Sequence, residues 1–83
     1  MDELPLVTQA EYRGGYKIAL TFADETRGVV DLDDWLEGPV FAPLREPGEF
    51  RRFSIEAGTI VWPNGADIAP ESLYERAKAH PAA

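Results

Sequence analysis

The first half of the chain alternates hydrophobic and polar positions with a period of two, which predicts strands. The clearest run covers residues 16–22, where every second side chain is large and apolar. A weaker alternation over residues 6–12 precedes it, and the two glycines between the runs predict a β-hairpin. A three-residue loop over residues 13–15 pairs Tyr12 with Tyr16 and sets apolar side chains opposite each other, which a two-residue loop does not. We therefore expect the longer loop, with a glycine at positive φ.

A third strand is predicted over residues 27–32, with its apolar side chains facing inward. Asp33 then follows as the N-cap of a short helix, which the Gly-Pro pair at residues 38–39 ends. Residues 40–45 are expected to add one helical turn, bounded by the Pro-Gly pair at residues 47–48. The middle of the chain is therefore predicted to be helical.

The second half repeats the strand pattern and ends in a helix. Two strands share an apolar face if a loop centred on Ala57-Gly58 joins them. Loops of two and of four residues both keep this register, and we favour four because alanine is a poor residue for the tightest turn. Pro70 is well placed at the first position of a final helix, whose apolar side covers the sheet.

These elements predict one small α+β domain over residues 1–83. The expected order is β-β-β-α-β-β-α, with a mostly antiparallel sheet of about five strands and the C-terminal helix packed on one face. A chain of 83 residues is of the size that builds a single core. Its apolar runs are all far shorter than the roughly 20 residues of a membrane span, so no membrane partner is expected.

The charge of the chain narrows the range of partners. Fifteen acidic and eight basic residues give a formal net charge of −7. Because nucleic-acid binders draw much of their affinity from basic side chains on phosphates, we expect no direct binding to DNA or RNA. A small basic protein is the partner that this charge would attract. The acidic N-terminal stretch, unlike a secretory signal, and the absence of cysteine favour a cytoplasmic location.

The sequence contains no motif with a known catalytic mechanism, so it predicts no catalytic residue, cofactor or metal. The single histidine, His80, is interpreted as a solvated residue near the C-terminus. Four carboxylates, those of Asp31, Asp33, Asp34 and Glu37, could offer oxygens to Mg²⁺ or Ca²⁺, but their spacing is not that of a calcium-binding loop. Helix capping and a solvated surface explain the same residues.

Residues 62–68, Trp-Pro-Asn-Gly-Ala-Asp-Ile, form the most distinctive stretch. As a structural element, this stretch is a strand-to-helix corner in which the tryptophan packs on the core and the Asn-Gly pair turns the chain. As a recognition element, it places two polar side chains beside an aromatic anchor. The candidate partner-binding residues are Trp35, Phe41, Trp62, Asn64 and Asp67.

A resemblance to a known family covers nearly the whole chain. The positions that carry it are Leu20-Thr21-Phe22, Val30-Asp31-Leu32, Phe41-x-x-Leu44 with Phe50, and Trp62-Pro63-Asn64-Gly65-x-Asp67-Ile68 before Leu73-Tyr74. They resemble the small bacterial family called domain of unknown function 2442. The resemblance implies a compact α+β domain and no catalytic residue. Similar members stand alone or are fused to a helix-turn-helix segment, and some lie beside small basic proteins in pairs that look like toxin–antitoxin modules.

Only nine residues follow Tyr74, so we expect the stand-alone form. The leading hypothesis is a non-catalytic protein-interaction module, acting as the acidic, antitoxin-like partner of a small basic protein. Binding would use an exposed sheet edge or an aromatic patch that includes Trp35 and Phe41. Two alternatives are a regulatory domain that acts on DNA only through a partner, and a metal-dependent enzyme built on the carboxylates of residues 31–37. Unpaired sheet edges also leave a homodimer open.

Overall fold

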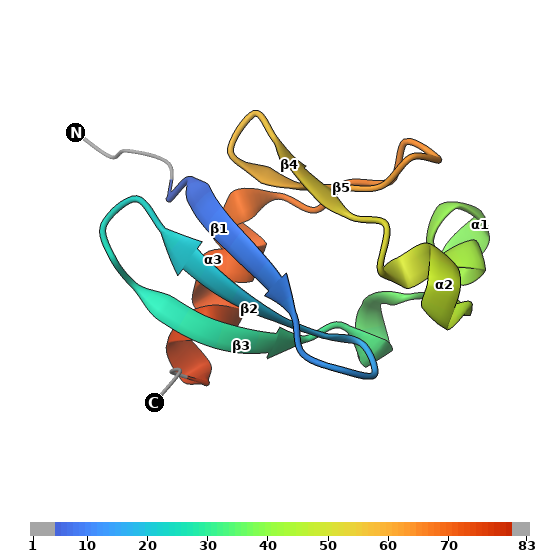
Figure 1. The fold of residues 1–83 in the computed structure, drawn as a ribbon, viewed down its shortest axis with the longest axis horizontal. Helices are drawn as coiled ribbons and strands as arrows, with labels where there is room; N and C mark the ends of the chain where they lie inside the picture. Colours follow the sequence, from blue (N-terminus) through green and yellow to red (C-terminus); the bar gives the residue numbers. More distant parts are fainter. Residues whose placement is uncertain (1–4, 81–83) are drawn as a thin grey trace.

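Five antiparallel strands divide between a three-stranded and a two-stranded sheet (Figure 1). The computed structural model describes residues 5–80. The strands are β1 (Val7–Tyr12), β2 (Lys17–Phe22), β3 (Arg27–Asp31), β4 (Ser54–Glu56) and β5 (Thr59–Val61). The helical elements are η1 (Asp33–Trp35), α1 (Gly38–Phe41), η2 (Ala42–Arg45), α2 (Pro47–Phe50) and α3 (Pro70–Ala79). The predicted α+β fold with five strands and a C-terminal helix is confirmed, with the strands shared between two sheets.

Residues 13–16 connect β1 to β2, and the Arg13 amide donates to the Lys17 carbonyl at 2.9 Å, so the chain reverses over residues 14–16 rather than over the predicted residues 13–15. Tyr12 therefore pairs with Ile18, and its predicted pairing with Tyr16 is wrong. Both loop glycines have positive φ, 97° and 55°, so the chain turns at the glycines themselves. Because the pairing moves by two positions, the same side chains still face the core.

A bulge at the start of β1 changes which side chain is buried there. The register shifts between Val7 and Gln9, so Val7 pairs with Phe22. Val7 is 3% exposed, whereas Leu6 is 42% exposed. The loop predicted from the sequence would also pair Leu6 with Phe22 and turn Leu6 inward. This is wrong, because the extra residue in the bulge turns Val7 inward in its place and leaves Leu6 on the outside.

The loop between β4 and β5 is the two-residue turn Ala57-Gly58, so the predicted four-residue loop is wrong. Ala57 adopts a positive φ of 52° in it. Contacts with β1 favour the tight turn: the Gly58 carbonyl accepts a hydrogen bond from the Val7 amide at 2.8 Å. A Cβ atom at Gly58 would lie 2.6 Å from the Leu6 side chain. This turn joins the two sheets.

Residues 33–50 form four short helical pieces, and three boundaries differ from the prediction. Asp33 is the first residue of η1 rather than its N-cap, and its amide donates to the carboxylate of Asp31 at 3.0 Å. Gly38 begins α1 instead of ending a helix, and Pro47 likewise begins α2. In both pieces a proline lies in the first turn, where its missing N–H leaves no intrahelical bond unmade.

Helix α3 begins at Pro70, as the sequence predicts, and covers the inner face of the three-stranded sheet (Figure 1). The contact is closest at Gly28 of β3, where a Cβ atom would lie 2.3 Å from the Ala77 carbonyl oxygen. The core lies between sheet and helix and extends beneath the short helical pieces. Its buried hydrophobic side chains are Val7, Ile18, Leu20, Phe22, Val30, Leu32, Leu36, Leu44, Phe50, Ile60, Trp62, Ala66, Ile68, Leu73 and Ala77.

Candidate partner-binding pocket

A pocket of about 290 Å³ opens where η1 and α1 meet the chain that leads into α3. It is lined by Trp35, Phe41, Asp67, Ile68, Ala69 and Ser72. Three of the five candidate residues from the sequence, two of them aromatic, therefore meet at one place although they are up to 32 positions apart. The other two support the pocket from outside its lining.

Trp35 is held in the pocket wall by an arginine of α3. The guanidinium carbon of Arg76 lies 4.2 Å from the centroid of the Trp35 ring, within the range of a cation–π contact. The same guanidinium binds both carboxylate oxygens of Asp34, at 2.6 and 3.1 Å, and donates to the Asp31 carbonyl at 2.8 Å. Arg76 itself is not among the residues that line the pocket.

Phe41 rests on Trp62, and Trp62 belongs to the core. The two rings meet edge to face with centroids 6.5 Å apart. Trp62 is only 3% exposed, and its indole N–H donates to the Phe50 carbonyl at 2.9 Å. Trp62 therefore positions Phe41 and offers almost no surface of its own to a partner.

Asn64 ties the α1 turn to the corner that precedes α3. Its side-chain amide donates to the Val40 carbonyl at 2.9 Å, while its side-chain oxygen accepts from the Ala66 amide at 3.0 Å. One exposed side chain thus holds both walls of the pocket, with Phe41 on one side and Asp67 on the other. Asn64 acts as a positioning residue.

The Asp67 carboxylate is exposed and has no side-chain hydrogen bond or ion pair within residues 5–80. Its backbone forms a single antiparallel bridge with Val61 at the edge of the two-stranded sheet, which fixes the residue in place. Further carboxylates follow in the chain beside the pocket lining: Glu37 between Trp35 and Phe41, and Glu71 at the start of α3. The pocket thus combines apolar walls with negative charge.

The carboxylates of residues 31–37 do not share one partner: Asp33 and Asp34 each pair with a different arginine, and Asp31 accepts a hydrogen bond from the Asp33 amide. Asp33 pairs with Arg45 at 2.8 Å, which raises the pKa of that guanidinium. Hydrogen bonds from Arg76 lower the pKa of the Asp34 carboxyl and outweigh the opposing effect of desolvation. Among the residues that the structure describes, no group of three or more His, Asp or Glu side chains is arranged to hold a metal ion.

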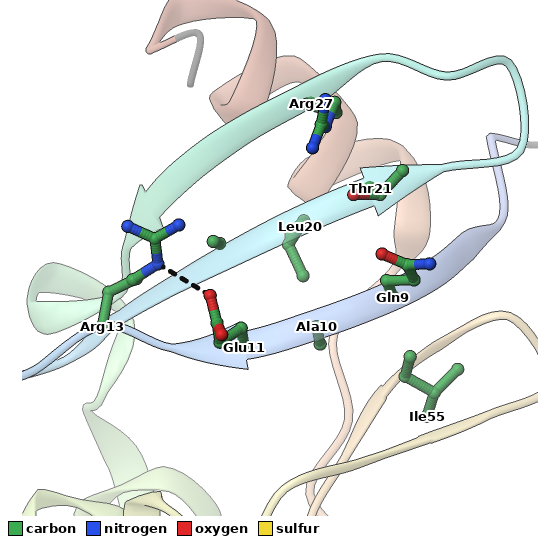
Figure 2. A pocket seen from close by; sticks show the side chains of 9 residues that line it. Gln9, Ala10, Glu11, Arg13, Leu20, Thr21, Arg27 and Ile55 are labelled. Atoms are coloured by element: carbon green, nitrogen blue, oxygen red, sulfur yellow. Dashed lines mark hydrogen bonds and ion pairs between the residues drawn. The ribbon is translucent and has the colours of Figure 1, made fainter. Parts of the chain in front are cut away.

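A second and larger hollow, of about 590 Å³, lies on the outer face of the three-stranded sheet (Figure 2). Its polar side chains come from all three strands, with Arg27 and Gln9 towards one end and the ion pair of Arg13 and Glu11, at 3.1 Å, at the other. Ile55 of β4 stands at its rim. Sequence reasoning does not single out this face, because it has no aromatic residue.

The two outer edges of the three-stranded sheet differ in their backbone hydrogen bonds. At β3, the Val29 amide donates a hydrogen bond to the His80 carbonyl at 3.0 Å, and the Arg76 guanidinium donates one to the Asp31 carbonyl at 2.8 Å. His80 therefore ends α3 with its backbone tied to the sheet. At β1, the register turns the backbone groups of Ala10 and Tyr12 outward, and they have no backbone partner within the described residues. A homodimer through a sheet edge stays a prediction, and β1 is the edge that it would use.

The chain is a small α+β domain with a pocket that is lined by two aromatic side chains and one carboxylate. Residues 7–79 match the model of the family described as "Protein of unknown function (DUF2442)". The chain therefore belongs to this family. A search of curated proteins and a search of solved structures each found no match. Within residues 5–80, no helix is long and apolar enough to span a membrane.

Proposed function

We propose that this chain is a non-catalytic protein-interaction domain that binds a small basic protein through the pocket of Trp35, Phe41 and Asp67. In this role it is the acidic, antitoxin-like member of a pair. The observation that carries the proposal is the unpaired Asp67 carboxylate beside two half-buried aromatic side chains. Aromatic side chains are enriched at protein interfaces, and a carboxylate beside them gives the pocket charge complementarity to a basic partner.

The charge distribution supports a basic partner. Five of the eight basic side chains are already in ion pairs within the chain. In contrast, many exposed carboxylates of residues 5–80 have no ion-pair partner. These are Asp24, Glu25, Asp31, Glu37, Glu46, Glu56, Asp67 and Glu71. The net field attracts cations and repels phosphates, which speeds encounter with a basic protein.

Co-expression with the product of the adjacent gene tests the proposal. We expect the two proteins to purify together as a complex of fixed stoichiometry in size-exclusion chromatography with light scattering. Raising the salt concentration from about 0.05 to 0.5 M should weaken the complex, because the Debye length shortens from about 14 to about 4 Å and the attraction between the two oppositely charged proteins is screened. Two proteins that elute separately at low salt would refute this pairing.

Two truncations of apolar side chains localise the contact. Phe41→Ala removes a pocket wall, and Ile55→Ala removes a 37%-exposed side chain at the rim of the other hollow. We expect the first variant to weaken the complex at least about tenfold, as loss of a hot-spot aromatic does, and the second to leave it unchanged. Equal effects of the two substitutions would contradict the pocket as the docking site.

A further inference from the structure

We propose that the pocket takes an arginine side chain of the partner, stacked on Trp35 and bound through its guanidinium to Asp67. This inference rests on the proposed function and names the group that the pocket recognises. It follows from the way in which the protein already holds one of its own arginines at the same tryptophan.

Arg76 shows which chemistry suits Trp35. Its guanidinium stacks over the indole at 4.2 Å and binds the Asp34 carboxylate with two nitrogens at 2.6 and 3.1 Å. The Arg76 side chain is 26% exposed, which makes it the least exposed of the ion-paired basic side chains. An indole surface beside a carboxylate therefore forms a working guanidinium site in this protein.

The pocket brings the same two elements together. Trp35 and Phe41 each contribute an aromatic ring to the lining, and Asp67 adds a carboxylate that accepts no hydrogen bond within the described residues. A planar guanidinium can stack on aromatic rings and bind a carboxylate through two nitrogens at once, which the compact ammonium of lysine cannot. Ser72 adds a hydroxyl to the lining.

The negative charge at the pocket excludes anionic ligands. The N-terminus of α3 borders the pocket, and a helix N-terminus carries about half a positive charge, which attracts anions. Two full negative charges stand beside it, however, on Asp67 and on Glu71 of the first turn. The carboxylates outweigh the helix dipole, so the pocket attracts a cation and repels phosphate or carboxylate groups.

Nuclear magnetic resonance of the full chain, labelled with ¹⁵N, tests the inference with the blocked tripeptides Gly-Arg-Gly and Gly-Lys-Gly. A single side chain should bind with a dissociation constant of about 1 mM or weaker. We expect the arginine peptide to move the indole N–H signal of Trp35 and the amide signals of Phe41 and Asp67. The indole signal of Trp62, whose N–H is bonded to the Phe50 carbonyl, should stay in place. The lysine peptide should bind several-fold more weakly.

Asp67→Asn and Glu11→Gln remove one carboxylate each and change the net charge equally. Glu11 lies on the outer face of the sheet, so its variant is the matched control. We expect Asp67→Asn to abolish the Trp35 shift and Glu11→Gln to retain it. Three results would overturn the inference: equal binding of the two peptides, equal loss of the Trp35 shift in the two variants, or shifts of the amide signals next to all exposed carboxylates alike.

The outcomes also separate this inference from the proposed function. If Asp67→Asn still forms the salt-sensitive complex with the basic partner at full strength, the chain is a docking domain but the pocket holds no arginine. If the arginine peptide binds as expected and no basic partner forms a complex, the arginine site stands and the proposed function fails.

Discussion

The pocket at Trp35 and the hollow on the sheet face differ in size, in chemistry and in what holds their walls. The hollow on the sheet face is twice as large, about 590 against 290 Å³, but its lining contains no aromatic residue and its charges are partly paired. The pocket at Trp35 has aromatic walls and an unpaired carboxylate. Interface hot spots are enriched in aromatic side chains that lie in well-packed, desolvated pockets, and this is why we propose the smaller hollow as the docking site.

The walls of the two hollows also differ in stiffness. The sheet face is held by continuous backbone ladders between β1, β2 and β3. The pocket is held by the single backbone bridge of Asp67 to Val61 and by individual side-chain bonds to backbone carbonyls, the exposed one from Asn64 to Val40 and the buried one from Trp62 to Phe50. Fewer hydrogen bonds make a segment easier to open locally. The pocket should therefore respond to single substitutions that leave the sheet intact.

Gly28→Ala should lower the stability most, because it disrupts the packing of α3 against β3, which holds the sheet and the pocket side together. Its new Cβ would lie 2.3 Å from the Ala77 carbonyl oxygen, and neither backbone can move without parting α3 from β3. We expect a loss of about 3 kcal/mol in the free energy of unfolding, measured with urea. Gly48→Ala is the control: its Cβ meets nothing within 4 Å, so that variant should be as stable as the wild type or about 0.5 kcal/mol more stable. Equal stability of the two variants would contradict the close packing.

Asn64→Ala should loosen the pocket and spare the sheet. It removes the side-chain hydrogen bonds of Asn64 to the Val40 carbonyl and the Ala66 amide. The free energy of unfolding should fall by about 1–2 kcal/mol, because both bonds are partly exposed. Hydrogen exchange should speed up at the amide of Ala42, which closes the α1 turn, before it changes at Ile18 of β2. Asn64→Asp keeps the acceptor for the Ala66 amide and loses only the donor to Val40, so about half the loss is expected. Uniform acceleration across both regions would show that they open together.

Tyr16→Phe tests the tie between the hairpin loop and the helical pieces. The hydroxyl of Tyr16 donates to the Arg45 carbonyl at 2.5 Å, while its ring packs edge to face on Phe50. Phenylalanine keeps the ring and loses the hydrogen bond, so stability should fall by about 1 kcal/mol in a urea titration. An unchanged midpoint would mean that water replaces the bond without cost.

Lowering the pH should have the smallest effect on stability. Near the pocket it should act by protonating the Asp34 carboxylate. Hydrogen bonds from Arg76 lower the pKa of Asp34 in the folded state. The resulting stabilisation is present above the unfolded pKa, near 3.8, and is lost as the pH falls through the lower folded value. We expect the fluorescence of Trp35 to change in that range as Arg76 is released. Asp34→Asn should remove this step, and a step of unchanged size in that variant would assign it to another carboxyl.

The sequence predicts the sheet better than the pocket because the two use different signals. Alternation along β2 reflects direct burial of Ile18, Leu20 and Phe22, so strand and face can be read from neighbouring positions. The bulge in β1 and the tight turn at Ala57 arise from contacts between the two sheets. Such contacts leave no local pattern, and a register derived from one hairpin alone misses them.

The sequence places Trp35 and Phe41 in one aromatic patch, but it does not place Asp67 beside them. Trp35, Phe41 and Asp67 stand out as aromatic and polar residues in short irregular segments, and the structure brings them to one pocket. Arg76 is absent from the prediction because it is 41 positions from Trp35, and one arginine on a helix looks like any solvated charge. Trp62 is buried and Asn64 bonds to the Val40 carbonyl, so these two residues hold the pocket in shape without lining it.

Mapping the contact of the basic partner on the ¹⁵N-labelled chain is the most direct test of the central claim, that the pocket and not the sheet face is the docking surface. Nuclear magnetic resonance of the complex should show its largest signal changes at Trp35, Phe41 and Asp67. Changes centred instead on Gln9, Thr21 and Arg27, with the pocket signals in place, would contradict the account.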